Sequence, residues 1–461
     1  MTRALRLILD ALRGAEQDYT TGSIRRAVVL LSVPMVIELL GESLFALVDV
    51  YFVSRLGTDA VATVGLTESV LTIIYSTAWG LGMGVTAVVA RRTGEQDATG
   101  ANIGAGQGIL IAVAVGLLIA LPGALFAEEI LSVMGASENV VSTGSAYTRW
   151  MFAGNVVIML LFSINAVFRG AGDPLLALVV LWVANMINMV LDPLLIFGWG
   201  PFPAMGIEGA AVATNIGRGI GVALQFWLLA RGVGRVRLGW HHFRPVWSVL
   251  VTIVRVSAGG ILQFLIASAS WVFLVRIVSS FGSVAVAGYT VAVRVMIFSL
   301  LPSWGVANAA ATLVGQNLGA KDPRRAERAT WLCGHYNMFY MVAVAVLFWL
   351  AAPWILGFFT TDAAVLQYAV DALRIICLGY FFYGYGMVLA QAFNGAGDSW
   401  TPTWMNLFCF WLVEIPLAWL LAKSLGWGPD GVFASVAMAE SLLAVVSAYF
   451  FRRGKWKLVQ V

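Results

Sequence analysis

Long apolar segments recur along the whole chain, separated by short stretches rich in charged residues and glycine. A helix needs about 20 such residues to cross the roughly 30 Å hydrocarbon core of a bilayer. No long stretch alternates apolar with polar residues, so the pattern disfavours a membrane barrel. The pattern therefore predicts twelve membrane-spanning helices, at 27–52, 61–90, 100–126, 142–168, 176–198, 207–231, 249–278, 286–313, 327–351, 364–393, 401–423 and 431–451.

Composition and charge also place this all-α protein in a membrane. Of 461 residues, 60% are hydrophobic and 11% are charged, against roughly 25% charged in soluble domains. With the N-terminus in the cytosol, 20 of the 28 lysines and arginines fall in cytosolic segments, and only Arg55 and Lys423 fall in outer loops. Cytosolic loops carry this excess, so we expect an inner (plasma) membrane protein with both termini in the cytosol. The net charge of +4 comes from these loops and does not indicate a nucleic-acid partner.

One phrase occurs twice, 225 positions apart: VFRGAGDP at 167–174 and AFNGAGDS at 392–399. The same offset aligns further glycine, aspartate and arginine positions, including Gly94 with Gly319. The chain therefore consists of two homologous halves of six spans. Because six is even, both halves enter the membrane from the same side, which makes a parallel repeat.

The repeat sets the predicted domain boundaries: a cytosolic leader at 1–26, a first lobe at 27–231, a linker at 232–248, a second lobe at 249–451 and a cytosolic tail at 452–461. The leader has apolar residues at helical spacing among arginines, which fits either a short helix on the membrane surface or a solvated segment. The duplicated phrase predicts a tight turn, with Asp173 as the N-cap of the next helix and Pro174 at its first position.

Polar residues inside the spans are the candidate functional groups, because a charge at mid-membrane costs at least ~2.5 kcal/mol and needs a partner or a purpose. Glu38, Glu42 and Asp49 share one face of the first span. Two pairs lie one turn apart on spans five and six, namely Asn188 with Asp192 and Ala210 with Thr214. If these spans meet, their oxygens suit a hard cation, or a proton shared by two close carboxylates. The alternative is a hydrogen-bonded network that only holds the helices together.

The whole chain resembles the multidrug and toxic compound extrusion (MATE) family. The matching segments are PMVIELLGESLFALVDVYFVSRLG (34–57), FRGAGDP (168–174), NMVLDPLLIFGWG (188–200) and GIEGAAVAT (206–214). The spacing of Asn188 and Asp192, together with Asp49, is similar to the branch that contains DinF-like and archaeal members.

The resemblance implies roles for several residues. It implies a Na⁺ or proton site formed by the positions that match Asp49, Asn188, Asp192 and Thr214. The backbone of Ala210 would contribute, and Asn165 matches a neighbouring polar position. Pro34 matches the family's first-span proline, where the helix bends, and proline in a helix removes a hydrogen bond in any case. Glu38 and Glu42 depart from the family pattern, so they are candidates for a substrate or accessory site.

The second half does not copy this site. Its span acids are Glu414 and Glu440, and Arg276 and Arg294 also lie in its spans. Internal ion pairing between these acids and arginines is one interpretation. A second substrate or proton site is the other.

These features predict a secondary antiporter that exchanges H⁺ or Na⁺ for its substrate while two lobes alternate in access. The resemblance supplies the substrate class, which is amphipathic and often cationic small molecules. The alternative is a flippase for a lipid or lipid-linked precursor, which predicts a lateral groove and basic residues for a phosphate headgroup. We expect no enzymatic activity, no cofactor beyond the coupling ion, contact with membrane lipid, and a monomer.

Overall fold

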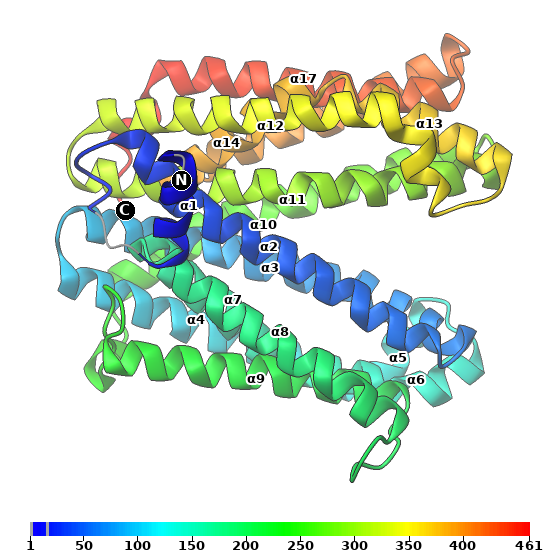
Figure 1. The fold of residues 1–461 in the computed structure, drawn as a ribbon, viewed down its shortest axis with the longest axis horizontal. Coiled ribbons are helices and arrows are strands. Elements are labelled where there is room, and N and C mark those ends of the chain that lie inside the picture. The colour runs from blue at the N-terminus through cyan, green and yellow to red at the C-terminus, as the bar shows by residue number, and fades with distance from the viewer. Residues whose placement is uncertain (1–2, 15–17) are drawn as a thin grey trace. The chain divides into compact units, whose positions relative to one another are not determined.

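The computed structural model describes residues 3–14 and 18–461, and the described residues form helices and loops without a strand (Figure 1). Contacts divide the chain into two units. The N-unit comprises Ile37–Ser257, and the C-unit comprises Met1–Val36 with Ala258–Val461. The boundaries of the predicted lobes fall in loops between helices. The boundaries of the two contact-based units fall inside two helices, after Val36 and after Ser257.

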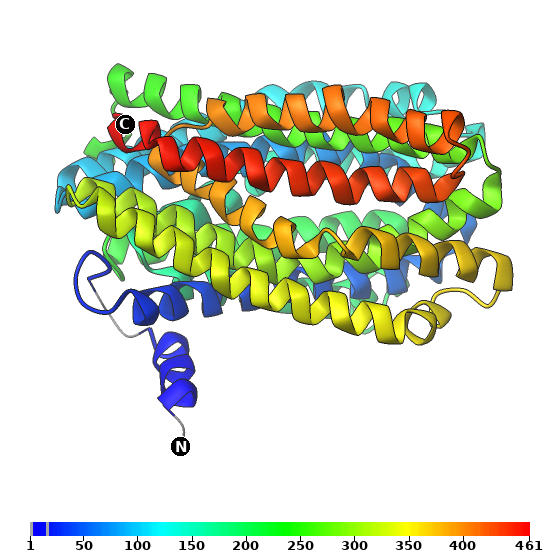
Figure 2. The ribbon, with the colours of Figure 1, turned by 90° about the horizontal axis from the view of Figure 1, so that it is seen from above.

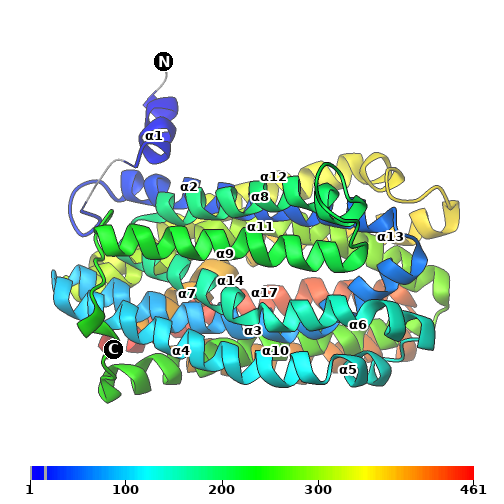
Figure 3. The same cartoon turned by 90° about the horizontal axis from the view of Figure 1, so that it is seen from below.

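The N-unit holds most of α2 and all of the helices up to the linker. Their bounds are α2 Ile24–Ser54, α3 Thr58–Gly94, α4 Ala98–Leu125, α5 Ala127–Val133, α6 Glu138–Ala153, α7 Asn155–Ala171, α8 Pro174–Phe197, α9 Ile207–Arg231 and the short 3₁₀ helix η1 Trp240–Phe243. The helices α8 and α9 run side by side (Figure 3).

The C-unit repeats this order after the leader helix α1. Its elements are α1 Arg3–Leu12, α10 Trp247–Ser279, α11 Ser283–Gly319, α12 Pro323–Gly357, α13 Ala363–Cys377, α14 Tyr380–Ala396, α15 Trp400–Asn406, η2 Leu407–Glu414, α16 Ile415–Trp419, η3 Leu420–Ser424, α17 Pro429–Arg453 and η4 Lys455–Leu458. The segment from α15 to η3 is one continuous helical rod in which η2 and η3 have π-helical hydrogen bonding. Stretches of π-helix are rare and are frequent at functional sites.

The predicted spans coincide with these helices, and the predicted all-α fold of repeated spans is confirmed. Among the described residues, ten helices are long and apolar enough to cross a membrane, and the bent pair α13–α14 makes an eleventh. The helix at the remaining predicted span, α9, has 25 residues but is less apolar. Its polar side chains, among them Asn215, Arg218 and Gln225, account for that difference. Arg218 and Gln225 contribute to the polar networks described below.

Two predicted spans are interrupted, which the hydrophobic pattern did not reveal. The fourth breaks at Gly154, between α6 and α7, and the tenth bends by 60° between α13 and α14. A Cβ atom at Gly379 would lie 2.9 Å from the carbonyl oxygen of Ala437, so glycine lets α14 start directly against α17.

The helices α2 and α10 each pass from one unit to the other. The change falls after Val36 in α2, two residues beyond Pro34, and after Ser257 in α10. Pro34 lies inside α2, where it removes a backbone hydrogen bond. The predicted hinge position is therefore next to the point where α2 changes units.

The duplicated phrase forms a turn in both halves, and each turn holds the segment that follows its half. Gly172 and Gly397 end α7 and α14 with left-handed φ values of 91° and 88°, which glycine adopts without strain. Asp173 stands at the N-cap position of α8 but does not cap it; its carboxylate accepts a 2.7 Å hydrogen bond from the Arg235 backbone in the linker. In the second half, the space beside Gly397 is filled by Val461 of the tail.

The leader is helical and tied to the C-unit. Figures 2 and 3 show α1 lying across the direction of the long helices of the C-unit. Ala11 and Tyr19 are buried against α2 and α11. The Arg325 guanidinium donates to the backbone carbonyls of Tyr19, Thr21 and Gly22 at 2.7–3.4 Å.

Candidate functional site

The predicted ion-site residues lie on α2, α8 and α9 of the N-unit, where Asp49 is half-buried and its charge acts on Asp192. The side chain of Asp192 is fully buried, and Asn188, Thr214 and Ala210 are nearly so. The amide of Asn188 donates a 3.0 Å hydrogen bond to the Thr214 hydroxyl. This bond ties α8 to α9 at the site and turns the amide oxygen of Asn188 away from the hydroxyl group.

Four oxygens at this site are buried without a hydrogen-bond partner among the described residues. They are one carboxylate oxygen of Asp49, the amide oxygen of Asn188 and both carboxylate oxygens of Asp192. Asp49 and Asp192 lie close enough for their charges to repel each other. Buried acceptors are normally satisfied, so this set is suited to a bound proton or a hard cation such as Na⁺.

Close packing of α8 and α9 holds these groups in place. A Cβ atom at Gly217 would lie 2.7 Å from the Ala184 carbonyl oxygen and 3.0 Å from the Cβ of Asn188. Gly221, one turn further on, also packs on Ala184. Small residues let helix backbones approach closely in membranes, and here they bring Thr214 within reach of Asn188.

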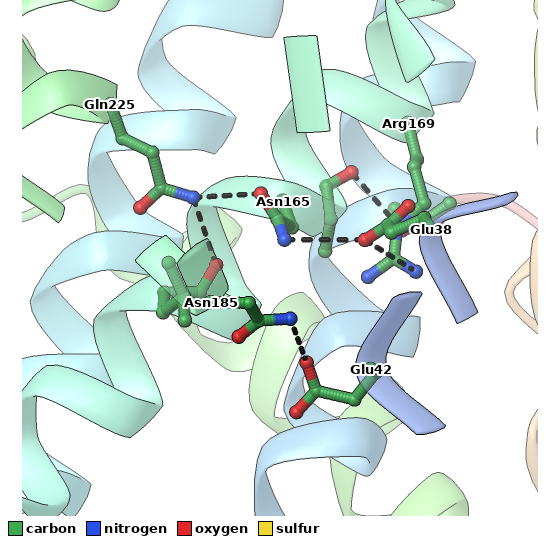
Figure 4. Close-up of polar contacts among 9 residues, drawn as sticks. Glu38, Glu42, Asn165, Arg169, Asn185 and Gln225 are labelled. Carbon is green, nitrogen blue, oxygen red and sulfur yellow. Dashed lines mark hydrogen bonds and ion pairs between the residues drawn. The ribbon is translucent and has the colours of Figure 1, made fainter. Parts of the chain in front are cut away.

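A second group of buried polar residues surrounds Glu38 (Figure 4). Its carboxylate lies 3.8 Å from the Arg169 guanidinium and accepts a 3.3 Å hydrogen bond from Asn165. Gln225 in turn donates a 2.7 Å bond to the Asn165 oxygen. This chain of contacts joins α2, α7 and α9, and the predicted accessory residues Glu38 and Asn165 are thus direct partners.

Glu42 is held by a different set of partners. It lies 3.9 Å from the Arg218 guanidinium and accepts a 3.1 Å bond from the Asn185 amide. Arg218 also contacts the Tyr75 hydroxyl at 3.4 Å, and the charges of Glu68 and Arg218 act on each other. The two acids that departed from the family pattern are therefore both paired with arginine.

Sequence reasoning missed several members of these networks. The predicted site residues did not include Arg169, Arg218, Glu68, Asn185 or Gln225. One signal was available, since Arg218 and Gln225 lie two turns apart in the span that carries Thr214.

In the C-unit, the interpretation that Glu414 and Glu440 form ion pairs with Arg276 and Arg294 is wrong. Both arginines are exposed, and neither acid has an ion-pair partner in the described part of the chain. Glu414 is 3% exposed, and the charges of the two acids act on each other. The two arginines are exposed whereas Glu414 is buried, which explains why these groups do not pair.

Tyrosine side chains lie near both acids of the C-unit. Glu440 lines a small cavity of about 10 Å³ with Tyr380 and Tyr383, which is room for one water molecule. The buried Tyr289 hydroxyl, which has no hydrogen-bond partner among the described residues, lies within electrostatic range of Glu414. Its ring stacks on Phe433 with centroids 5.8 Å apart.

Comparison with known proteins decides the family. A family model described as MatE matches residues 34–194 and 260–420, two segments of equal length that lie one within each half of the repeat. The chain belongs to the MATE family. Its curated relatives include transporters of this family, so this MATE protein is a multi-pass membrane transporter.

Three relatives match almost the whole MATE chain. A FAD transporter of Shewanella oneidensis is 28% identical over 433 residues, which cover 93% of this chain and 95% of that protein. A probable multidrug resistance protein NorM of Thermotoga maritima is 24% identical over 439 residues, 94% of this chain and 93% of that one. The multidrug export protein MepA of Staphylococcus aureus is 23% identical over 424 residues, 92% of each.

Two solved structures show the same fold. One is described as an outward-facing conformation of a multidrug resistance MATE family transporter of the MOP superfamily; it has a TM-score of 0.88 and 26% identity and covers 98% of this chain and 99% of its own. The other is a MOP superfamily transporter of Pyrococcus furiosus, described as having a binding pocket of reverse polarity that suggests a different function. It also has a TM-score of 0.88 and 26% identity, with 98% of each chain covered.

Proposed function

We propose that this MATE protein is an antiporter that exports amphipathic, cationic small molecules in exchange for H⁺ or Na⁺. The observation that carries the proposal is the set of buried oxygens without partners on Asp49, Asn188 and Asp192. Two close carboxylates in a low dielectric cannot both stay charged at low cost. A proton or Na⁺ bound there would neutralise them, and its release would restore the repulsion that favours the other conformation.

Charge balance supports a cationic substrate. The N-unit networks contain the carboxyl groups of Glu38, Glu42, Asp49, Glu68 and Asp192 but the guanidinium groups of only Arg169 and Arg218. An excess of acids attracts a cation and repels an anion. The competing proposal is an anionic substrate, because one of the relatives is a FAD transporter. Arg218 would be the first residue to contact such a substrate.

The hinge and the second acidic site belong to the same proposal. Pro34, next to the point where α2 changes units, would let the first span bend when the ion binds. Glu414 and Glu440 would act as an accessory proton site, because both lack an ion-pair partner in the described chain while tyrosine hydroxyls lie nearby. The hinge role rests on the position of Pro34 in α2. The accessory role of Glu414 and Glu440 rests on their lack of an ion-pair partner among the described residues.

Flux in proteoliposomes tests the proposal, with pH and Na⁺ gradients imposed separately. Asp49→Asn and Asp192→Asn keep size but remove charge, and a buried charge is worth several kcal/mol, so ion-driven efflux of a lipophilic cation should fall by at least about tenfold. Glu208→Gln is the matched control, because glutamine can still accept the 2.7 Å bond that Trp150 donates to Glu208. Wild-type efflux against a gradient by Asp49→Asn would reduce this site to a structural role.

A further inference from the structure

A groove of about 470 Å³ runs along the C-unit between α10 and the α16–η3 segment. Figure 2 shows these two segments side by side, α10 in green and the α15–η3 rod in orange. The Trp411 indole, which donates a 3.0 Å hydrogen bond to the Ile266 carbonyl, holds them together. The groove lies outside the acidic sites of both units, since it shares no residue with them.

The groove is basic at one end and apolar at the other. Arg276 and Ser280 are one turn apart near the end of α10, and Lys423 lies near the end of η3. The deeper part is lined by Phe273, Ile415 and other apolar side chains. Helix ends of a membrane protein lie near the bilayer interface, and helix middles lie in hydrocarbon. The groove therefore has the same polarity, from interface to core, as a lipid molecule.

The two cations are available for a ligand. None of the eight lining residues is acidic, and neither cation forms an ion pair within the described residues. The Lys423 ammonium lies 4.3 Å from the centre of the Phe281 ring, a weak contact when exposed. Arginine can bind two phosphate oxygens at once, and lysine adds a point charge.

We propose that this groove binds the phosphate of an anionic phospholipid, with the headgroup at Arg276, Ser280 and Lys423 and an acyl chain along Phe273 and Trp419. The Trp419 side chain, at 58% exposure, and that of Phe273, at 44%, can contact a chain without rearrangement. A free phosphate would use the basic end but leave the apolar part unfilled. The lipid makes use of both ends.

Native mass spectrometry of the full chain in detergent tests this site without any gradient or substrate, so its outcome does not depend on the transport proposal. We expect one phosphatidylglycerol to bind in preference to phosphatidylcholine with the same acyl chains. The double variant Arg276→Gln/Lys423→Gln should bind phosphatidylglycerol at least about tenfold more weakly, because two charged hydrogen-bond donors are lost. Arg294→Gln, an exposed arginine outside the groove, should bind as the wild type does.

Three outcomes would overturn the proposal. They are unchanged phosphatidylglycerol binding by the double variant, equal binding of the two lipids, and competition by inorganic phosphate as effective as that by lipid. The last would indicate a site for free anions. Trp419→Ala provides a second test, because it should weaken both lipids while preserving the preference for phosphatidylglycerol.

Discussion

Two arginines separate the buried acids of the N-unit into two kinds. Arg169 pairs with Glu38 and Arg218 with Glu42, so these acids have permanent counter-charges. Asp49 and Asp192 have buried oxygens without a hydrogen-bond partner and no ion pair within the described residues. One oxygen of Glu38 also lacks a hydrogen-bond partner there, but that carboxylate still has Arg169 as its counter-charge. A group that already has a counter-charge gains little from an added ion, whereas an unpaired carboxyl gains much. We therefore assign ion binding to the aspartates and the linking of α2 to α7 and α9 to the glutamates.

Glu38→Gln should lower the stability of the protein by about 3 kcal/mol, because it leaves Arg169 buried without its carboxylate. Glutamine can still accept the Asn165 bond, so the loss reports on charge. Thermal unfolding in detergent, followed by tryptophan fluorescence, measures it. Glu327→Gln is the control: it removes the partly exposed 2.6 Å pair with Lys457 and should cost less than about 1 kcal/mol. Equal losses would contradict the assignment.

At the scale of helices, the glycines of α9 determine whether the ion site forms. Gly217 faces the backbone of α8, and Gly219 has nothing within 4 Å of its would-be Cβ. The two positions lie on the same helix and differ in what they face. Close approach of α9 to α8 is what brings Thr214 to Asn188.

Gly217→Ala and Gly219→Ala form a matched pair of substitutions. Alanine favours a helix over glycine by about 1 kcal/mol, so Gly219→Ala should leave the melting temperature unchanged or raise it. Gly217→Ala should lower it and reduce ion-driven flux, because the new Cβ would lie 2.7 Å from a backbone oxygen. Equal behaviour of the two variants in melting and flux assays would show that this contact does not position the site.

At the scale of the whole molecule, the distribution of basic residues predicts the orientation. Two single cysteines test the predicted outer loops, Ala204→Cys and Ala363→Cys. Two others test the predicted cytosolic segments, Trp240→Cys and Ala320→Cys. All four positions are exposed. An impermeant thiol reagent applied to cells should label the first two only. The native cysteines are buried and should not interfere. The reverse labelling pattern would invert the topology.

The linker between the halves is held to α4 by hydrogen bonds. Gln107 bonds the carbonyls of His242 and Arg244 and the amide of Val246, each at 3.0 Å. The ring Nδ1 of His242 accepts a 2.9 Å bond from the Gly239 amide, which requires the neutral ring. Burial, and then the neighbouring His241, lower the pKa of His242 below its ordinary 6.5.

The folded linker favours the neutral form of His242. The contribution of this residue to the stability of the folded linker is therefore complete above about pH 6.5, and it is lost as the pH falls toward the lowered pKa. Hydrogen exchange at residues 239–246, corrected for intrinsic rates, should therefore speed up on acidification. The turn at 320–322, which has no histidine, is the control and should not change. Equal acceleration of both segments would indicate general loosening.

The sequence by itself determined the helical spans, the duplication, the tight turns and the residues of the candidate ion site. These features depend on local spacing: apolar runs set the spans, and residues one turn apart on one helix share a face whatever packs against it. Asn188 with Asp192, and Ala210 with Thr214, could be paired on that basis. The resemblance implied that the two pairs and Asp49 form one site.

Tertiary structure alone decided which partner each buried charge has. Helix rotation and contacts between residues far apart in sequence decide these partners. They pair Arg169 with Glu38 and Arg218 with Glu42. They also keep Arg276 away from Glu414. A hydrophobic pattern sets which residues lie in the membrane but not which of several polar side chains meet across helices. The meeting of Asn188 and Thr214 was decided in the same way, by the absence of a side chain at Gly217, because only helices without a Cβ between them can approach so closely.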